Sequence, residues 1–275
     1  MIELPEAFSL SRQIGEAASG KKMIDVIVEQ TAHKLAWYYG DKKEIPGMLI
    51  GKRIDGATSH GGLVEIKAGG SNILFGDGVN IRFHEKGEQR PQRHQMLIEL
   101  DDGSALSAVV QMYGGIGAFA DGGLDNPYYL TAKQSPSPLS KEFDLDRFTS
   151  LVSDPGVQKM SLKALLATKQ RIPGLGNGVL QDILFDARMH PKRKVSTLNG
   201  KDREALFQSL NRTLAAMAEG GGRDTETDLY GHPGRYQTVL SKRTMNDPCP
   251  ACGGPITKEA YMGGTVYYCA NCQTL

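Results

Sequence analysis

The feature that most constrains this chain is a set of four cysteines at its end. Cys249 and Cys252 form one Cys-x-x-Cys pair, CPAC, and Cys269 and Cys272 form a second, CANC, 16 residues later. Two such pairs supply the four thiolates of a tetrahedral zinc site. Because four thiolates leave no open coordination position, we expect one structural Zn²⁺ in a C-terminal zinc ribbon.

Composition places the chain among globular proteins. Its 275 residues are 40% hydrophobic and 23% charged, and no apolar run approaches the roughly 18 residues needed to cross a bilayer. The start, MIELPEAFSL, has no basic cluster ahead of an apolar stretch, so it does not resemble a signal peptide. We expect a cytoplasmic monomer with no membrane partner, a setting in which cysteines bind metal rather than form disulfides.

Charge is distributed unevenly along the chain. Residues 1–134 contain 14 Lys and Arg against 17 Asp and Glu, whereas residues 135–275 contain 18 against 14. The second half is therefore mildly basic. A bias of this size is compatible with a polyanionic partner, and it is also common on ordinary solvated surfaces.

The first half of the chain predicts a helix followed by an antiparallel sheet. Residues 4–19 place Ala7, Leu10, Ile14 and Ala17 at helical spacing, with Pro5 in the first turn. Short β-rich runs then alternate with glycine and charge up to about residue 112, which favours a sandwich or a barrel. The runs are MIDVIVEQ, MLIGKRI, GLVEIKA, NILFG, VNIRFH, QMLIEL and ALSAVVQM.

The second half predicts an all-α unit that ends in the zinc ribbon. A Gly-, Pro- and Ser-rich segment around residues 120–140 lacks periodicity and is interpreted as the linker. Helical spacing follows, with Ser161 as a cap and residues 220–222, all glycine, as a stop. The predicted helices lie in residues 144–154, 161–172, 177–189 and 200–220. We therefore predict a multi-domain α+β protein with boundaries at 1–130, 131–140, 141–230 and 231–275.

A glycine-bracketed turn, Gly174 to Gly178, opens directly into one of these helices. Exposed N–H groups at a helix start, including those near Gly176 and Gly178, can bind phosphate, and Asn177 adds a side-chain amide. A turn of this kind is also a common tight connection between two helices.

The surrounding residues carry a specific resemblance. LKALLATKQRIPGLGNGVLQDILFDARMHP is similar to the helix-two-turns-helix of the formamidopyrimidine-DNA glycosylase and endonuclease VIII family, base-excision enzymes that remove oxidised bases. The tail CPACGGPI…YYCANCQ, the start MIELPEA and the segment SPSPLS also resemble that family. The resemblance implies an N-terminal helix on a β-sandwich, a hinge, a helical domain and a zinc finger, with damaged or abasic double-stranded DNA between the domains and a nucleoid location in a bacterium.

The family's chemistry implies roles for particular residues. Its N-terminal proline amine attacks the deoxyribose C1′ and forms a Schiff base, while two glutamates transfer protons. Glu3 and Glu6 match these glutamates, Asn177 matches a phosphate-binding asparagine, and Lys163 matches a basic residue that opens the helical motif. Ile2 stands where the proline would be, so the free amine belongs to Met1 when the initiator is retained.

Other family positions also differ here. The expected hairpin lysine falls near Gly62, and a Met-Ser-Gly stretch whose Met wedges into the base stack falls near FGDGVNIR. An Arg-Phe pair that probes the opposite strand falls near Gly115 and Ile116, and a finger arginine falls near Gly264. Without a wedge, detection of damage in an intact duplex should be impaired, and recognition of an unpaired substrate should be impaired less.

Several side chains have two interpretations. Glu3 could simply stabilise a helix start. His60 and His84 could replace missing basic groups or could be packing residues. Trp37, with Tyr38 and Tyr39, could stack on bases or pack in a core or an interface.

Three function hypotheses follow. The first is a damaged-base DNA glycosylase, with abasic-site lyase activity through Met1. The alternative is a non-catalytic protein that binds damaged DNA or DNA structures and has lost the chemistry. A third is an RNA-binding role, because helical units with zinc ribbons also occur in ribosome-associated proteins.

Overall fold

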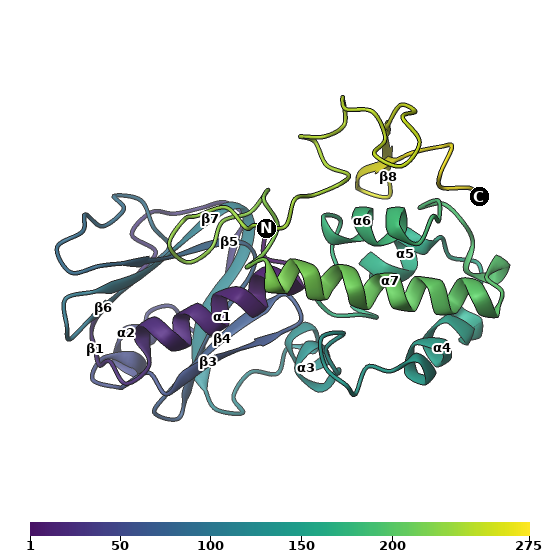
Figure 1. Ribbon diagram of the computed structural model, residues 1–275. Coiled ribbons are helices and arrows are strands. Elements are labelled where there is room, and N and C mark those ends of the chain that lie inside the picture. The colour runs from purple at the N-terminus through teal and green to yellow at the C-terminus, as the bar shows by residue number, and fades with distance from the viewer.

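A computed structural model describes residues 1–275. Figure 1 shows a sheet with helix α1 on one side of the molecule and a group of helices on the other, with a small hairpin module above the helices. The N-terminus lies where the two parts meet. No helix has the length and apolar character that a membrane crossing requires.

Helix α1, Leu4–Ala18, confirms the predicted N-terminal helix. Pro5 stands in the first turn, where its missing N–H removes no helical hydrogen bond. The Glu6 side chain accepts the backbone N–H of Glu3 at 3.2 Å and so caps the helix. The apolar stripe of α1 is buried, and the helix packs against strands of the sheet on one side and against α7 on the other.

Seven strands form one largely antiparallel sheet in the order β1-β6-β7-β5-β4-β3, with β2 paired to β7 in parallel. The long strands β5 and β7 pair along most of their length, and a register shift between Asp77 and Val79 divides the sheet into two halves. One core of 27 buried residues joins both halves to α1. The strands are β1 Met23–Val28, β2 Ala36–Tyr39, β3 Gly56–His60, β4 Leu63–Ala68, β5 Ser71–His84, β6 Met96–Leu100 and β7 Ala105–Ala120.

The structure differs from the predicted strand pattern in three places. MLIGKRI was expected to be a strand, but Ile45–Leu49 form the short helix α2, with Pro46 in its first turn and Gly51 at φ +90° beyond its end. NILFG and VNIRFH belong to the single strand β5. Strands β2 and β3 were not predicted, because pairing with β7 and β4 rather than an alternating apolar pattern determines them.

The segment expected to be an irregular linker contains helix α3, Pro127–Gln134. Asn126 caps it by accepting the N–H of Tyr129 at 3.1 Å. Tyr129 and Ala132 pack into a small cluster with residues of the sheet, so α3 belongs structurally to the first half of the molecule. The prediction of an unstructured connection was wrong because a helix this short has little sequence periodicity.

The second half has its own core of 20 buried residues. Ser161 caps α5, as predicted, by accepting the N–H of Ala164 at 3.2 Å. Positive φ angles at Lys169 and Gln170 end the regular structure after α5, so α5 is shorter than its sequence pattern suggested. The helices are α4 Leu145–Ser153, α5 Leu162–Ala167, α6 Val179–Asp186 and α7 Gly200–Glu219. The C-terminal hairpin consists of β8 Thr257–Tyr261 and β9 Gly264–Tyr268.

Candidate active site and nucleic-acid interface

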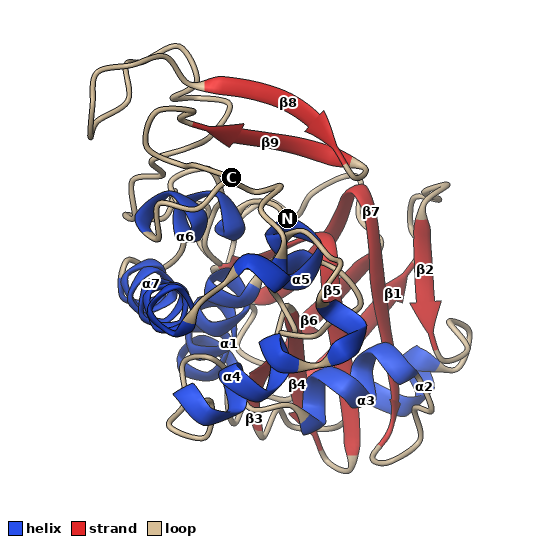
Figure 2. Cartoon of the chain, turned by 90° about the vertical axis from the view of Figure 1, so that its right-hand side faces the viewer, coloured by secondary structure: helices blue, strands red, loops and turns tan.

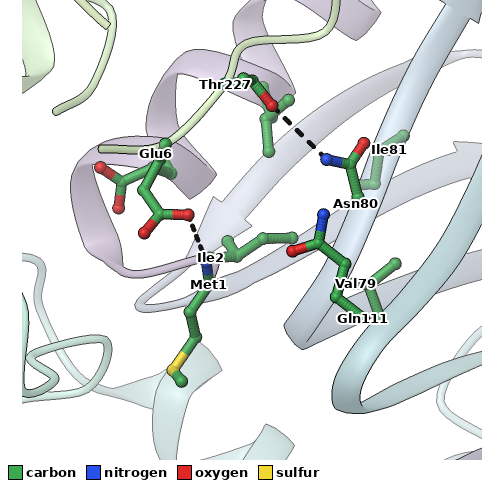
Figure 3. A pocket seen from close by; sticks show the side chains of 10 residues that line it. Met1, Ile2, Glu6, Val79, Asn80, Ile81, Gln111 and Thr227 are labelled. Atoms are coloured by element: carbon green, nitrogen blue, oxygen red, sulfur yellow. Dashed lines mark hydrogen bonds and ion pairs between the residues drawn. The ribbon is translucent and has the colours of Figure 1, made fainter. Parts of the chain in front are cut away.

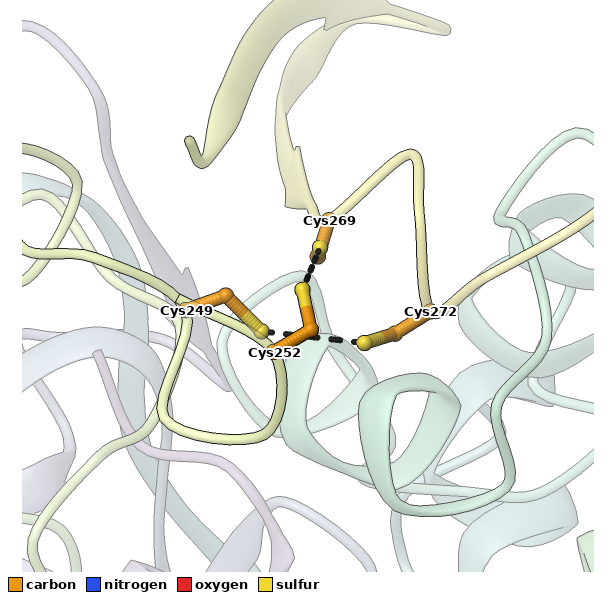
Figure 4. Close-up of side chains that lie close together, drawn as sticks. All are labelled: Cys249, Cys252, Cys269 and Cys272. Atoms are coloured by element: carbon orange, nitrogen blue, oxygen red, sulfur yellow. Dashed lines mark hydrogen bonds between the residues drawn. The ribbon is translucent and has the colours of Figure 1, made fainter. Parts of the chain in front are cut away.

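The four cysteines converge as their spacing predicts (Figure 4). Their sulfur atoms all lie within 4.8 Å of one another, with Cys249 Sγ 3.8 Å from Cys272 Sγ and Cys252 Sγ 3.5 Å from Cys269 Sγ. Four sulfurs bound at about 2.3 Å to a tetrahedral zinc ion are about 3.8 Å apart. These separations fit a metal site and are far too long for disulfides.

The hairpin β8–β9 is docked on the helical motif by polar contacts to its backbone. Asn177 Nδ2 donates to the carbonyl of Thr265 at 2.6 Å, and Gln181 exchanges hydrogen bonds with Thr265 and Tyr267. Lys163, which is buried, donates its ammonium to the carbonyl of Tyr261. Lys163 and Asn177, which were predicted separately, therefore both lie at the junction between helices and ribbon.

The glycine turn encloses the Glu3 side chain. The N–H groups of Gly178 and Val179, at the start of α6, donate to Glu3 Oε1 and Oε2 at 2.9 and 2.8 Å. A Cβ on Gly176 would lie 2.5 Å from Glu3 Oε1, so only glycine fits there. The helix start that the sequence suggested for phosphate binding thus holds a carboxylate of the chain's own N-terminus.

Arg223 completes this site, and the sequence analysis did not identify it. Its guanidinium donates to both carboxylate oxygens of Glu6, at 2.9 and 2.8 Å, and lies 3.5 Å from Glu3 Oε2. All three side chains are buried. Arg223 follows three glycines and lies in no periodic pattern, so the sequence does not mark it as a site residue. The one available indication was that Glu3 and Glu6, if buried, would need a cation.

The two glutamates have opposite pKa shifts. Burial raises the pKa of Glu3, and the opposing charge of Arg223 and the hydrogen bonds from Gly178 and Val179 do not overcome it. Burial also disfavours the Glu6 carboxylate, but the charge of Arg223 and its hydrogen bonds outweigh burial and lower the pKa of Glu6. Paired carboxyls with separated pKa values are typical of sites in which one group transfers protons and the other remains ionised.

The Met1 amine lies beside this group. It is ion-paired with Glu226, a residue of the loop that follows α7. Ile2 is buried, and its N–H donates to the carbonyl of Asp77 at 2.7 Å, which anchors the N-terminus to the irregularity in β5. Figure 3 shows Met1, Ile2 and Glu6 around a small pocket whose far wall is formed by β5 and β7 side chains.

Met1 and Glu3 line two further cavities. One, of about 140 Å³, is also lined by Asp77, Tyr128 and Gln170. The other, of about 300 Å³, extends along the ribbon and is lined by polar residues that include Asn177, Gly178, Thr238, Lys242 and Tyr267. The N-terminal amine and the Glu3 carboxyl therefore lie at the junction of two spaces between the halves of the molecule.

The remaining candidate residues lie elsewhere or close to other groups. His60 lies 3.6 Å from the buried Glu65, and His84 lies 2.8 Å from Ser107 Oγ; neither lines the two cavities. Gly264 lies against Asn177, whose side-chain atoms would be 3.3 Å from a Cβ at that position.

Comparisons with known proteins agree over the whole chain. A family model described as the formamidopyrimidine-DNA glycosylase H2TH domain matches residues 135–228. The formamidopyrimidine-DNA glycosylases of Listeria monocytogenes and Symbiobacterium thermophilum are 26% and 28% identical; each alignment covers 99% of this chain, with 100% and 89% of the relative.

Solved structures show the same fold. Lactococcus lactis Fpg in complex with abasic-site DNA superposes with a TM-score of 0.84 at 22% identity, over 99% of this chain and all of that chain. The Thermus thermophilus protein superposes with a TM-score of 0.80 at 24% identity, over 98% of each chain. The chain therefore contains a formamidopyrimidine-DNA glycosylase H2TH domain and is similar over its whole length, in sequence and in fold, to formamidopyrimidine-DNA glycosylases.

Proposed function

We propose that the chain is a base-excision repair enzyme, a DNA glycosylase that removes damaged bases and cleaves abasic sites as a lyase. The observation that carries this proposal is the position of the Met1 amine and the Glu3 carboxyl, which line the same two cavities between the sheet and the helical motif. Full-length relatives that are named as glycosylases support it.

In the proposed reaction, the Met1 nitrogen bonds to C1′ of the damaged nucleotide while the bond from C1′ to the base breaks, and the base leaves with the proton that the newly bonded nitrogen releases. The amine must first lose a proton, since an ammonium has no lone pair, and Glu226 is the acceptor in contact with it. Glu3, whose pKa is raised, protonates the sugar oxygen as the ring opens to the iminium. The ion pair with Arg223 keeps Glu6 charged and in place.

The proposed partner is double-stranded DNA that contains a damaged or abasic nucleotide. Its backbone would follow the larger cavity, where Asn177, Gly178 and Lys242 meet the ribbon. Asn177 Nδ2 uses one N–H for the carbonyl of Thr265, and its second N–H can donate to a phosphate oxygen. Lys163 retains N–H donors beyond the one bonded to Tyr261, and Gly176 gives the turn the space that the Glu3 carboxyl occupies. The structure of Lactococcus lactis Fpg in complex with abasic-site DNA supports DNA as the partner.

The metal is proposed to be one structural zinc ion, held by Cys249, Cys252, Cys269 and Cys272. Bound zinc would supply stability to the ribbon and no catalysis, because four thiolates complete its coordination. We propose residues 1–130 as the catalytic-type domain, 131–140 as the linker, 141–230 as the DNA-binding domain and 231–275 as the zinc finger; the linker so defined begins within α3.

A second candidate is a protein that binds damaged DNA without cutting it. The observation that favours it is that the Met1 amine is already engaged by Glu226, at a position where Ile2 has replaced the family's proline. The same contact therefore allows two opposite roles for Glu226: it could accept the amine proton and activate the nitrogen, or it could keep the nitrogen from reacting.

Borohydride trapping separates the two candidates. Wild-type protein is incubated with a duplex that contains an abasic site and is reduced, and intact-mass analysis locates the adduct and reports whether Met1 is present. A covalent adduct on residue 1 supports the lyase, whereas tight binding with no adduct and no base excision on any oxidised-base substrate supports the binding protein. The same assay on Glu3→Gln tests the role of the Glu3 carboxyl. Glu16→Gln, on the exposed side of α1, is its matched control.

A further inference from the structure

Two exposed aromatic rings lie next to the proposed active site. Trp37 on β2 and Tyr113 on β7 stack with ring centroids 6.3 Å apart and planes inclined by 17°. They are 39% and 36% exposed, and the neighbouring Leu35 and Met112 are each 60% exposed. An exposed cluster of large apolar side chains beside a binding site usually marks a surface that binds a partner.

The Trp37 ring occupies a space that a side chain at Gly115 of β7 would otherwise fill. In the parallel pairing of β2 with β7, Trp37 lies opposite Gly115. A Cβ on Gly115 would lie 2.4 Å from Trp37 Nε1 and 2.6 Å from Tyr39 Oη. Gly115 is where the resemblance places the Arg-Phe pair that probes the opposite strand. At this position the chain therefore presents aromatic rings from β2 in place of a β7 side chain.

The pair is continuous with the proposed site. Tyr113 Oη lies 3.6 Å from Met1 Sδ, and Met1 lines both cavities. Figure 2 shows β2 beside β7 at the edge of the sheet. The exposed Lys34 and Lys43 flank β2 in the sequence, as do the exposed Asp41 and Glu44.

We propose that Trp37 and Tyr113 form a stacking platform for an unpaired nucleobase, and that the preferred substrates are lesions in single-stranded or unpaired DNA. This inference rests on the proposed function in DNA and adds the substrate class. A flat aromatic face stacks on any base, but it cannot reach a base that is paired within a duplex. The methionine wedge that would open a duplex is missing, so the platform acts on bases that are already unstacked.

Trp37 is the only tryptophan of the chain, so its fluorescence reports directly on this surface. The full-length protein is titrated with three oligonucleotides that carry the same tetrahydrofuran abasic analogue, one single-stranded, one in an unpaired bubble and one in an otherwise paired duplex. We expect the first two to quench Trp37 strongly and to bind more tightly than the duplex.

Variants test the platform against a general loss of binding. Trp37→Ala should weaken binding to single-stranded and bubble DNA by about 5- to 150-fold and change duplex binding less than about threefold, the range expected for the loss of one stacked base. Trp37→Phe should keep most of the affinity. Phe8→Ala, which removes a ring that is 42% exposed on α1, should have no effect.

The outcomes separate this inference from the proposed function. Unquenched Trp37 in a protein that binds single-stranded DNA, or an equal loss on all three oligonucleotides in Trp37→Ala, overturns the platform and leaves the enzyme proposal intact. Quenching and the expected affinities with these oligonucleotides, together with no trapping on a natural abasic site and no excision of an oxidised base, support the platform and contradict the enzyme. A wild-type protein that binds none of the three oligonucleotides overturns both.

Discussion

The guanidinium of Arg223 donates two hydrogen bonds to the carboxylate of Glu6, Nε to Oε1 at 2.9 Å and Nη2 to Oε2 at 2.8 Å. The backbone N–H of Arg223 donates to the same carboxylate at 3.1 Å. This pair joins the first turn of α1 to the loop after α7. It thereby holds the N-terminus, the sheet and the helical domain in one arrangement.

Replacement of Arg223 by Ala should destabilise the protein by about 3–5 kcal/mol, because it leaves two buried carboxylates without their cation. Chemical denaturation measures the change. Arg212→Ala, which breaks an exposed pair with Asp186, is the control and should change stability little. A loss below about 1 kcal/mol in Arg223→Ala would show that the buried cluster relaxes or hydrates.

Glu3→Gln should lower the rate of base excision by about 100-fold or more while DNA affinity stays within a few-fold. The amide keeps the shape of the carboxyl but cannot transfer its proton. Single-turnover excision and fluorescence anisotropy measure the two quantities, with Glu16→Gln as the control. Equal losses of rate and affinity would assign Glu3 a role in supporting the start of α6 instead.

Glu226→Gln distinguishes activation of the Met1 amine from its sequestration. If Glu226 accepts the amine proton, the variant should trap abasic DNA about tenfold more slowly near neutral pH and recover at higher pH, where solvent removes the proton. The pH profile of the trapping rate is the measurement. Faster trapping in the variant would mean that Glu226 holds the amine inactive.

Acid stability should depend on Glu65, which is fully buried between β3, β4 and α3. Burial disfavours its charge, but the His60 ring 3.6 Å away, the hydrogen bond from Tyr129 and the nearby charge of Lys133 lower the pKa of Glu65 from 4.5 to about 2. A carboxyl with a depressed folded pKa contributes stability above its unfolded pKa and loses it as pH falls through the folded one.

The unfolding free energy should therefore decrease between about pH 4.5 and pH 2, by up to about 3 kcal/mol from this group. Glu65→Gln should flatten that part of the profile, as measured by urea denaturation at a series of pH values. Glu99→Gln, a partly exposed carboxyl paired with Arg90, is the control. An unchanged slope in Glu65→Gln would contradict the assignment.

Removal of the proposed zinc should release the ribbon from the helical motif. The chain has four cysteines, all in this cluster, so thiol labelling reports on the ribbon alone. A chelator should increase reactive thiols from about none to four and abolish DNA binding, because Asn177 and Lys163 lose the hairpin carbonyls they contact. Protection that survives metal-free preparation would argue against a metal site.

The sequence by itself determined the features with short-range signals. Cysteine spacing predicted the cluster, and the capping residue Ser161 with its apolar period predicted the helical motif. The helical spacing after Pro5 predicted α1, and the resemblance identified Glu3 and Glu6 as candidates. Each of these rests on residues that are neighbours along the chain, where the period of a helix or the reach of a ligand pair is visible in the sequence.

Only the tertiary structure decided which distant residues meet. Arg223 reaches Glu6 across 217 positions, and Glu226 reaches Met1 across 225. Strand β2 could not be predicted from the sequence, because it pairs with β7 only where the glycines of β7 leave space for it. Burial then separated the pKa values of two similar glutamates, since the cost of a charge depends on its surroundings and not on its residue type.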